Sequence, residues 1–129
     1  MPKMVKKPRL GTIACGEHIL AVENIETYDL VPEDIPCDFT LKCKGDSMIN
    51  ARIFDGDIVY IRQQDIVEDN EIAAVLIDDD ATLKRVRIFG DHVVLEPANP
   101  MYQPLVFWGE DMNRMRILGK AVAFLSLVR

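Results

Sequence analysis

Short apolar runs separated by turn-forming residues recur along most of the chain. Residues 39–44 alternate between apolar and polar types, and residues 72–77 form the continuous apolar run that is typical of a central strand. No stretch keeps a helical period, although residues 46–53 could hold one short turn of helix. The same pattern predicts further strands at residues 58–61, 81–89, 92–95 and 117–128. We therefore expect a mainly β fold in one domain.

The first nine residues differ in character from the rest of the chain. They contain two prolines and four basic residues, which is typical of a linker or a flexible tail. We expect a linker remnant or flexible tail at residues 1–9 and one folded domain at residues 10–129, a length that can bury a conventional core. Three prolines also predict an irregular stretch between residues 97 and 104.

Composition and charge narrow the function classes. No apolar run approaches the roughly 20 residues that a membrane-spanning helix needs, and we expect no secretory signal. The three cysteines are odd in number and lack metal-site spacing, which predicts reduced thiols in a cytoplasmic protein. Residues 1–10 carry four basic residues and no acid, whereas the remaining 119 carry 11 basic and 21 acidic residues. A body with a net charge of −10 is a poor surface for binding nucleic acid.

The candidate chemistry lies in one serine and one lysine. Ser47 lies in the turn-like sequence Gly45-Asp46-Ser47-Met48, and Lys84 lies in a predicted strand. Alternation along residues 82–88 places Lys84 on the more apolar face, opposite the two arginines of that strand. Burial on that face would lower the pKa of the lysine, and a neutral lysine can serve as the base that activates a serine.

The residues by themselves leave other interpretations open. The serine segment can be a simple polar turn after a strand, and Lys84 can be a lysine on an irregular surface strand. A Ser-His-Asp triad would need His18 or His92 as its base, and His92 lies in a predicted hairpin. The three aspartates at residues 78–80 lack the spacing of a calcium loop, so we expect a solvated turn there. We expect neither a metal nor a cofactor.

Three segments, in this order along the chain, resemble the self-cleaving domain of LexA-like repressors. They are the small-residue bond Cys15-Gly16, the turn Gly45-Asp46-Ser47-Met48 and the strand Thr82-Leu83-Lys84-Arg85-Val86. The resemblance runs from about Leu10 to the C-terminus, and its further pieces are Phe54-Asp55-Gly56-Asp57, Glu71-Ile72-Ala73-Ala74-Val75, Leu95-Glu96-Pro97-Ala98-Asn99 and Gly119-Lys120-Ala121-Val122. It implies a mainly β fold of strongly twisted antiparallel sheets, of the kind that LexA-like domains share with signal peptidases.

The resemblance implies a serine endopeptidase that cuts its own chain between Cys15 and Gly16. Ser47 would be the nucleophile and Lys84 the base, and the backbone N–H groups of Ser47 and Asp46 would stabilise the oxyanion. Family members commonly have alanine in place of Cys15, and cysteine is also known at this position. The segment must lie in the active site to be cut and elsewhere to be spared, which implies two states of the loop.

The resemblance also implies partners. A LexA-like repressor is cut in the response to DNA damage, the SOS response, when a RecA filament on single-stranded DNA favours the state that is cut. Such repressors form homodimers through this domain, and residues 121–125 are a candidate contact. They read DNA with a helix-turn-helix domain, which we expect to be absent from this chain because its first ten residues are too few.

Three alternatives share part of this pattern. A UmuD-like accessory protein of error-prone DNA synthesis has the same serine, lysine and Cys-Gly bond without a repressor domain. A catalytically idle dimerisation module would not need both Ser47 and Lys84. A signal-peptidase-like enzyme that acts on other chains shares the chemistry, but we expect no membrane anchor here.

Overall fold

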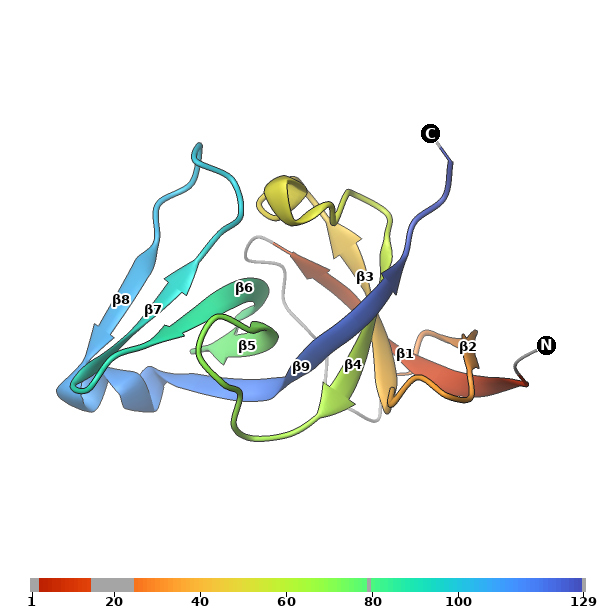
Figure 1. Cartoon of the computed structure of the whole chain (residues 1–129), viewed down its shortest axis with the longest axis horizontal. Helices are drawn as coiled ribbons and strands as arrows, with labels where there is room; N and C mark the ends of the chain where they lie inside the picture. Colours follow the sequence, from red (N-terminus) through yellow and green to blue (C-terminus); the bar gives the residue numbers. More distant parts are fainter. Residues whose placement is uncertain (1–2, 15–24, 79, 129) are drawn as a thin grey trace.

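The computed structural model describes residues 3–14, 25–78 and 80–128, and within them the chain is almost entirely strand and loop (Figure 1). The prediction of a mainly β fold is confirmed. The elements are β1 (Met4–Ala14), β2 (Thr27–Pro32), β3 (Phe39–Lys44), the 3-10 helix η1 (Ile49–Ala51), β4 (Ile58–Gln63), β5 (Ile72–Ile77), β6 (Asp80–Ile88), β7 (His92–Glu96), β8 (Leu105–Trp108), the 3-10 helix η2 (Gly109–Arg114) and β9 (Met115–Leu125).

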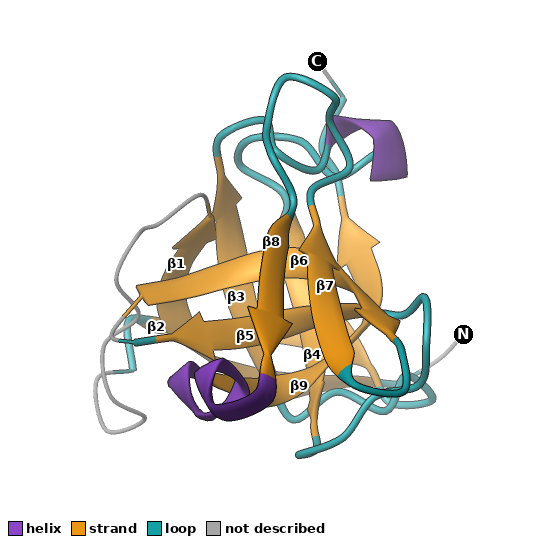
Figure 2. Cartoon of the chain, turned by 90° about the vertical axis from the view of Figure 1, so that its left-hand side faces the viewer, coloured by secondary structure: helices purple, strands orange, loops and turns teal. Residues whose placement is uncertain are grey.

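The described strands form one sheet in the order β2-β1-β3-β4-β9-β5-β6-β7-β8. Neighbouring strands are antiparallel except β1 and β3, which are parallel. The last strand, β9, lies between β4 and β5 and so joins the first four strands to the other four (Figure 1). Figure 2 shows β7 and β8 running steeply across β5 and β9, as a strong twist requires. Because of this twist, β1 contacts β6 although several strands separate them in the sheet order.

Three clusters of buried apolar side chains stabilise the sheet. The first packs Leu41 and Ile61, from β3 and β4, against Met48, Ala74 and Leu83. Each fully buried leucine or isoleucine contributes about 1.5–3 kcal/mol. The second cluster centres on Val75, Val86 and Leu95, and the third on Val31, Cys37 and Tyr60. Since the first cluster draws on strands from both sides of β9, it holds the two halves of the sheet together.

Most of the predicted strands are present, with shifts of a few residues at their ends. The runs at residues 39–44 and 72–77 coincide with β3 and β5, and the predicted turn of helix is η1. The sequence did not predict β2 or β8. These are the two edge strands. In β2 apolar and polar residues do not alternate regularly, and β8 is a run of only four apolar residues directly after Pro104, in the proline-rich stretch expected to be irregular.

The N-terminal segment differs from our expectation of a linker or tail. Residues 4–9 form the first part of β1 and pair with β2. Arg9 donates hydrogen bonds to both carboxylate oxygens of Asp29, at 2.9 and 2.6 Å, and the Thr40 hydroxyl donates a third at 2.6 Å. Burial disfavours the charged form of Asp29, but these hydrogen bonds outweigh it and lower its pKa. The segment is a strand because its backbone pairs with β2, and Asp29 of β2 gives the basic Arg9 an acidic partner. Composition alone reveals neither contact.

Candidate active site

The turn that carries Ser47 follows β3 and is held by the loop before β4. Gly45 has a φ of 98°, in the left-handed region that favours glycine, so the chain bends sharply at this point. The Gly45 N–H donates a hydrogen bond to Asp55 Oδ1 at 2.8 Å. The buried carboxylate of Asp57 accepts a bond from the Phe54 N–H at 2.8 Å and fixes the loop that supplies Asp55. Asp55 and Asp57, which the sequence analysis named only as part of the LexA-like pattern, therefore position the serine turn.

A second segment, residues 97–104, holds the same turn from another side. The Asn50 N–H donates to the Ala98 carbonyl at 2.7 Å, and the Ala98 N–H donates to Met48 Sδ at 3.4 Å. Met48 is 1% exposed and Ser47 is 6% exposed. The serine is thus part of a packed turn and not of a solvated loop.

Sequence reasoning missed the role of Asn99 in this arrangement. Its Nδ2 donates a hydrogen bond to the Asp46 carbonyl oxygen at 2.8 Å, and the Tyr102 hydroxyl bonds the Asp46 carboxylate. The available signal was its place in the segment Leu95–Asn99, which matched the LexA-like pattern. That match does not show which backbone atom the amide contacts.

Lys84 lies in the middle of β6 with its side chain almost completely buried. It is 8% exposed, and Nζ donates to Thr82 Oγ1 at 2.6 Å and to the Leu83 carbonyl at 3.4 Å. Its backbone pairs with Ala73 of β5, and Val86, which shares its face of the strand, is also buried. These contacts agree with the expectation that Lys84 points to an apolar side. A lysine in such a place is uncommon, because an ammonium loses much of its hydration on burial.

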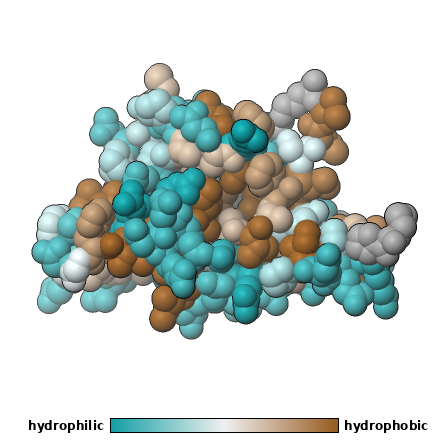
Figure 3. All heavy atoms as spheres, viewed as in Figure 1, coloured by the Kyte–Doolittle hydropathy of each residue, from teal (hydrophilic) through white to brown (hydrophobic). Residues whose placement is uncertain are grey.

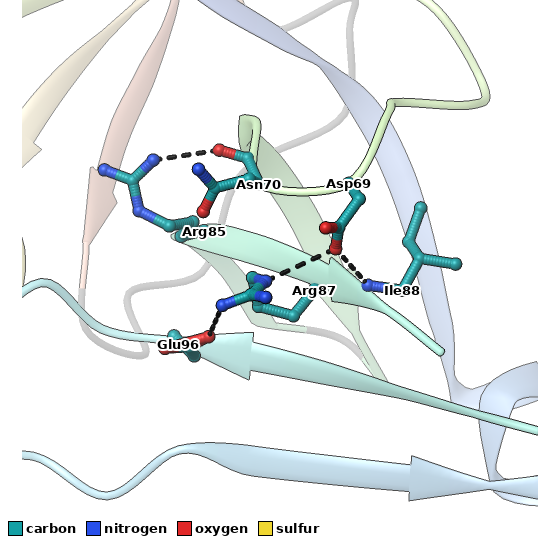
Figure 4. Close-up of polar contacts among 6 residues, drawn as sticks. All are labelled: Asp69, Asn70, Arg85, Arg87, Ile88 and Glu96. Atoms are coloured by element: carbon teal, nitrogen blue, oxygen red, sulfur yellow. Dashed lines mark hydrogen bonds and ion pairs between the residues drawn. The ribbon is translucent and has the colours of Figure 1, made fainter. Parts of the chain in front are cut away.

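The arginines of β6 point to the opposite, more solvated face, as alternation predicted. Arg87 contacts carboxylate oxygens of Asp69 and Glu96, each at 3.3 Å, and Arg85 donates to the Asn70 carbonyl at 2.8 Å (Figure 4). Both arginines are only partly buried. One strand therefore separates partly exposed guanidinium groups from a buried amine.

The residues next to Ser47 and Lys84 pack in the same core. Met48 and Leu83 both belong to the first cluster, and Ala98 packs against it. Ala98 follows β7, which pairs with β6. The segment after β7 therefore contacts the serine turn and continues from the strand that pairs with the strand of Lys84. Leu83 and Lys84 point to opposite faces of β6, so the shared cluster lies on the face of Leu83.

The predicted cleavage bond, Cys15-Gly16, lies outside the described residues. The strand before it is described as far as Ala14, whose backbone pairs in parallel with Lys44. Lys44 is the last residue of β3, immediately before the serine turn. Since β1 also contacts β6, it lies beside both the strand that leads to the serine and the strand that carries the buried lysine.

Two of the other candidate residues, His92 and Asp78, make contacts with nearby side chains. The His92 ring stacks on Phe89 and Trp108, with centroid separations of 4.6 and 3.9 Å. Asp78, the first of the three consecutive aspartates, forms an ion pair with Arg114 at 2.9 Å. His18 lies outside the described residues. The stacking on Phe89 and Trp108 gives the His92 ring two aromatic packing partners in the β6–β8 region.

Thiol and metal chemistry receive no support from the part of the chain that the structure describes. Cys37 and Cys43 are buried thiols, and burial raises the pKa of Cys37. Within residues 3–14, 25–78 and 80–128, no group of three His, Cys, Asp or Glu side chains could hold a metal ion. No helix in these ranges is long and apolar enough to cross a membrane.

Comparisons with known proteins match this arrangement to one family. The Peptidase S24-like family matches residues 8–122. A LexA repressor of Caldicellulosiruptor saccharolyticus is 41% identical over 95% of this chain, and one of Leptospira biflexa is 46% identical over 89%. The chain spans 59% and 56% of the length of these two relatives, so it corresponds to part of a longer protein in each. The matched range includes Ser47 and Lys84 together with β3, β6 and the segment 97–104. The chain belongs to the Peptidase S24-like family.

Proposed function

We propose that this chain is the self-cleaving serine peptidase domain of a LexA-like transcriptional repressor, with Ser47 as the nucleophile and Lys84 as the base. The observation that carries the proposal is that Ser47 and Lys84 are both buried, and that the segment after β7, which contacts the serine turn, continues from the strand paired with β6. Membership of a peptidase family and the similarity to LexA repressors support peptide-bond cleavage as the reaction.

In the proposed reaction, the neutral amine of Lys84 takes the hydroxyl proton of Ser47 while Oγ attacks the carbonyl carbon of Cys15. The new C–O bond moves an electron pair onto the carbonyl oxygen. When this intermediate collapses, the C–N bond breaks and the Lys84 ammonium returns the proton to the Gly16 nitrogen. The products are an ester between Cys15 and Ser47 Oγ and a fragment that begins at Gly16. A water molecule, deprotonated by Lys84, then hydrolyses the ester.

Two features of the surroundings support these roles. The Thr82 hydroxyl accepts a hydrogen bond from Lys84 Nζ and restricts where the amine can point. The backbone N–H groups of Asp46 and Ser47 are the proposed oxyanion donors. The bend at Gly45 and the contacts from residues 97–104 hold this turn in place before any reaction, and donors fixed in advance stabilise an oxyanion most effectively.

The position of β1 supports the proposed substrate. Ala14, the last residue of β1, directly precedes Cys15 in the sequence, and its backbone pairs with Lys44 at the end of β3. Small residues such as Cys15 and Gly16 allow a backbone to approach a nucleophile closely. We propose two states of the segment, one in which the bond meets Ser47 and one in which it does not, with the first state less populated.

The rate of self-cleavage should rise with pH, by about tenfold per unit while Lys84 is mostly protonated, and then level off. The reason is that only the neutral amine can accept the serine proton. Incubation of purified protein from about pH 6 to about pH 10, followed by mass spectrometry, measures both the rate and the cut bond. The expected product begins at Gly16. A rate that does not respond to pH, or a cut at another bond, would contradict the proposed pair.

We also propose a homodimer that forms through the end of β9. Residues 119–125 pair with β4 on one side, whereas the described pairing with β5 ends at Lys120. Residues 121–125 therefore have one strand edge without a neighbour in the described part of the chain, and unpaired edges favour association. Exposed apolar side chains gather at the C-terminal end of the chain, namely Phe124, Leu125, Leu127 and Val128 (upper right of Figure 3).

Phe124→Glu should convert the dimer to a monomer at micromolar concentration, because it places a charge at the proposed contact. Ile66→Glu is the matched control, since Ile66 is 79% exposed in the loop between β4 and β5. Sedimentation velocity measures both variants. A monomeric wild-type protein would contradict the proposed dimer, and an equal effect of the two substitutions would place the contact elsewhere.

The remaining partners follow from the repressor assignment. We propose that cleavage is stimulated by a RecA filament on single-stranded DNA and that DNA is bound through a separate helix-turn-helix domain, in the cytoplasm. A domain with 21 acidic and 15 basic residues repels phosphates, so this chain alone should show no sequence-specific binding to duplex DNA in a mobility-shift assay at physiological salt.

A further inference from the structure

Asn99 is the buried polar side chain through which the segment after β7 contacts the peptide unit before Ser47. It is 5% exposed and lies in the irregular segment after β7. Its Oδ1 accepts a hydrogen bond from the Met101 N–H at 2.9 Å, and its Nδ2 donates one to the Asp46 carbonyl oxygen at 2.8 Å. Since a backbone N–H can only donate, Oδ1 must face Met101 and the amide nitrogen must face Asp46.

The contacted carbonyl belongs to the same peptide unit as the Ser47 N–H. A trans peptide unit is planar, and its C=O and N–H groups point in opposite directions. The Asp46 carbonyl also accepts a hydrogen bond from the Ile49 N–H, at the longer distance of 3.3 Å. Two donors, of which Asn99 is the closer, therefore fix the direction of the carbonyl and, through the rigid plane, the direction of the Ser47 N–H.

We propose that Asn99 is a positioning residue that aims the Ser47 N–H at the oxyanion. The inference rests on the proposed function, because it needs Ser47 to be the nucleophile. An oxyanion donor accelerates a reaction only if it already points at the oxygen that becomes charged, and the loss of one such donor lowers a rate by about 100- to 1,000-fold. The hydrogen bond to the carbonyl also polarises the peptide unit and makes its N–H a stronger donor.

Asn99→Ser provides the sharpest test. A serine hydroxyl can still accept the Met101 N–H, as in other serine turns, but it is too short to reach the Asp46 carbonyl. The rate of appearance of the fragment that begins at Gly16 should fall by about 10- to 100-fold at every pH. The pH of the half-maximal rate should not move, because Lys84 is unchanged. The NMR signal of the Ser47 amide should shift in the same variant.

Asn113→Ser is the matched control. It makes the same exchange at an exposed asparagine of η2, away from the serine turn. Its cleavage rate should stay within about threefold of wild type. Asn99→Ala, which removes both hydrogen bonds of the side chain, should be at least as slow as Asn99→Ser.

The outcomes separate this inference from the proposed function. If wild-type protein is cut after Cys15 and folded Asn99→Ser is cut equally fast, the inference is wrong and the proposed function stands. If the variant changes the midpoint of the pH profile together with the rate, the effect passes through Lys84 and the inference is also wrong. If wild-type protein is never cut, the proposed function fails and the role of Asn99 fails with it.

Discussion

Ser47→Ala protein should remain uncut under conditions in which the wild-type protein cleaves itself, a loss of at least about 1,000-fold in rate. The substitution removes the only atom that can form the proposed ester. It deletes one hydroxyl from a packed turn, so the fold should persist. Mass spectrometry of the Gly16 fragment measures cleavage, and the near-ultraviolet circular dichroism of the aromatic side chains reports the fold. Ser126→Ala is the matched control, because Ser126 is the other serine of the chain and is exposed.

Lys84 should be equally necessary, since the two side chains act as one proton-transfer unit. Lys84→Ala should slow cleavage by at least about 1,000-fold, and adding Ser47→Ala should cost little more. Lys84→Arg should fail as well, because a guanidinium stays protonated at any working pH. Lys42→Ala, on the exposed side of β3, should be cut normally. Efficient cleavage in a folded Ser47 or Lys84 variant would assign the chemistry to other residues, and no cleavage by wild type would favour an idle dimerisation module.

Gly119→Ala should destabilise the domain by about 1–3 kcal/mol or more. Gly119 lies in β9 and pairs with Gln63 of β4 and Ala74 of β5. A Cβ at this position would lie 2.5 Å from the Arg62 carbonyl oxygen and 2.5 Å from Ile61 Cγ2. The first of these is a backbone atom, so relief requires β4 and β9 to move apart. Urea unfolding compared with wild type measures the loss as a lower midpoint.

Gly90→Ala is the matched control for this substitution. Gly90 lies in the turn between β6 and β7, has no positive φ, and leaves open space where a Cβ would be. Its stability should stay within about 0.5 kcal/mol of wild type. If both alanine variants unfold at the wild-type midpoint, β4 and β9 do not approach each other as closely as the structure describes.

The loss at Gly119 has a functional consequence that follows from the sheet order. Ser47 follows β3, which pairs with β4, whereas Lys84 lies on β6, which pairs with β5. Only β9 connects β4 to β5 within the described sheet. A variant that loosens the contact of β9 with β4 should therefore also slow self-cleavage, because it uncouples the half that holds the serine from the half that holds the lysine.

The sequence predicted the inner strands well because burial leaves a pattern that can be read locally. The alternation at residues 39–44 and the apolar run at 72–77 correspond to β3 and β5, where inward side chains have few alternatives to an apolar type. The edge strand β2 has no regular alternation, and β8 is an apolar run of only four residues after a proline-rich stretch, so neither gave a clear local signal. The basic segment at residues 4–9 was expected to be a tail because its strand pairing depends on β2 and Asp29, which come later in the chain.

The sequence by itself determined the mainly β class, the family and the identity of the two candidate catalytic residues. Alternation along β6 separated Lys84 from the arginines, and the Gly-Asp-Ser-Met turn marked Ser47, because both signals depend on residues close together in the chain. Tertiary structure alone decided that β9 lies between β4 and β5, that β1 runs beside β3 and β6, and that Asn99 contacts the peptide unit before Ser47. These are contacts between residues far apart in sequence, and they are set by the packing of the whole sheet, which no local pattern encodes.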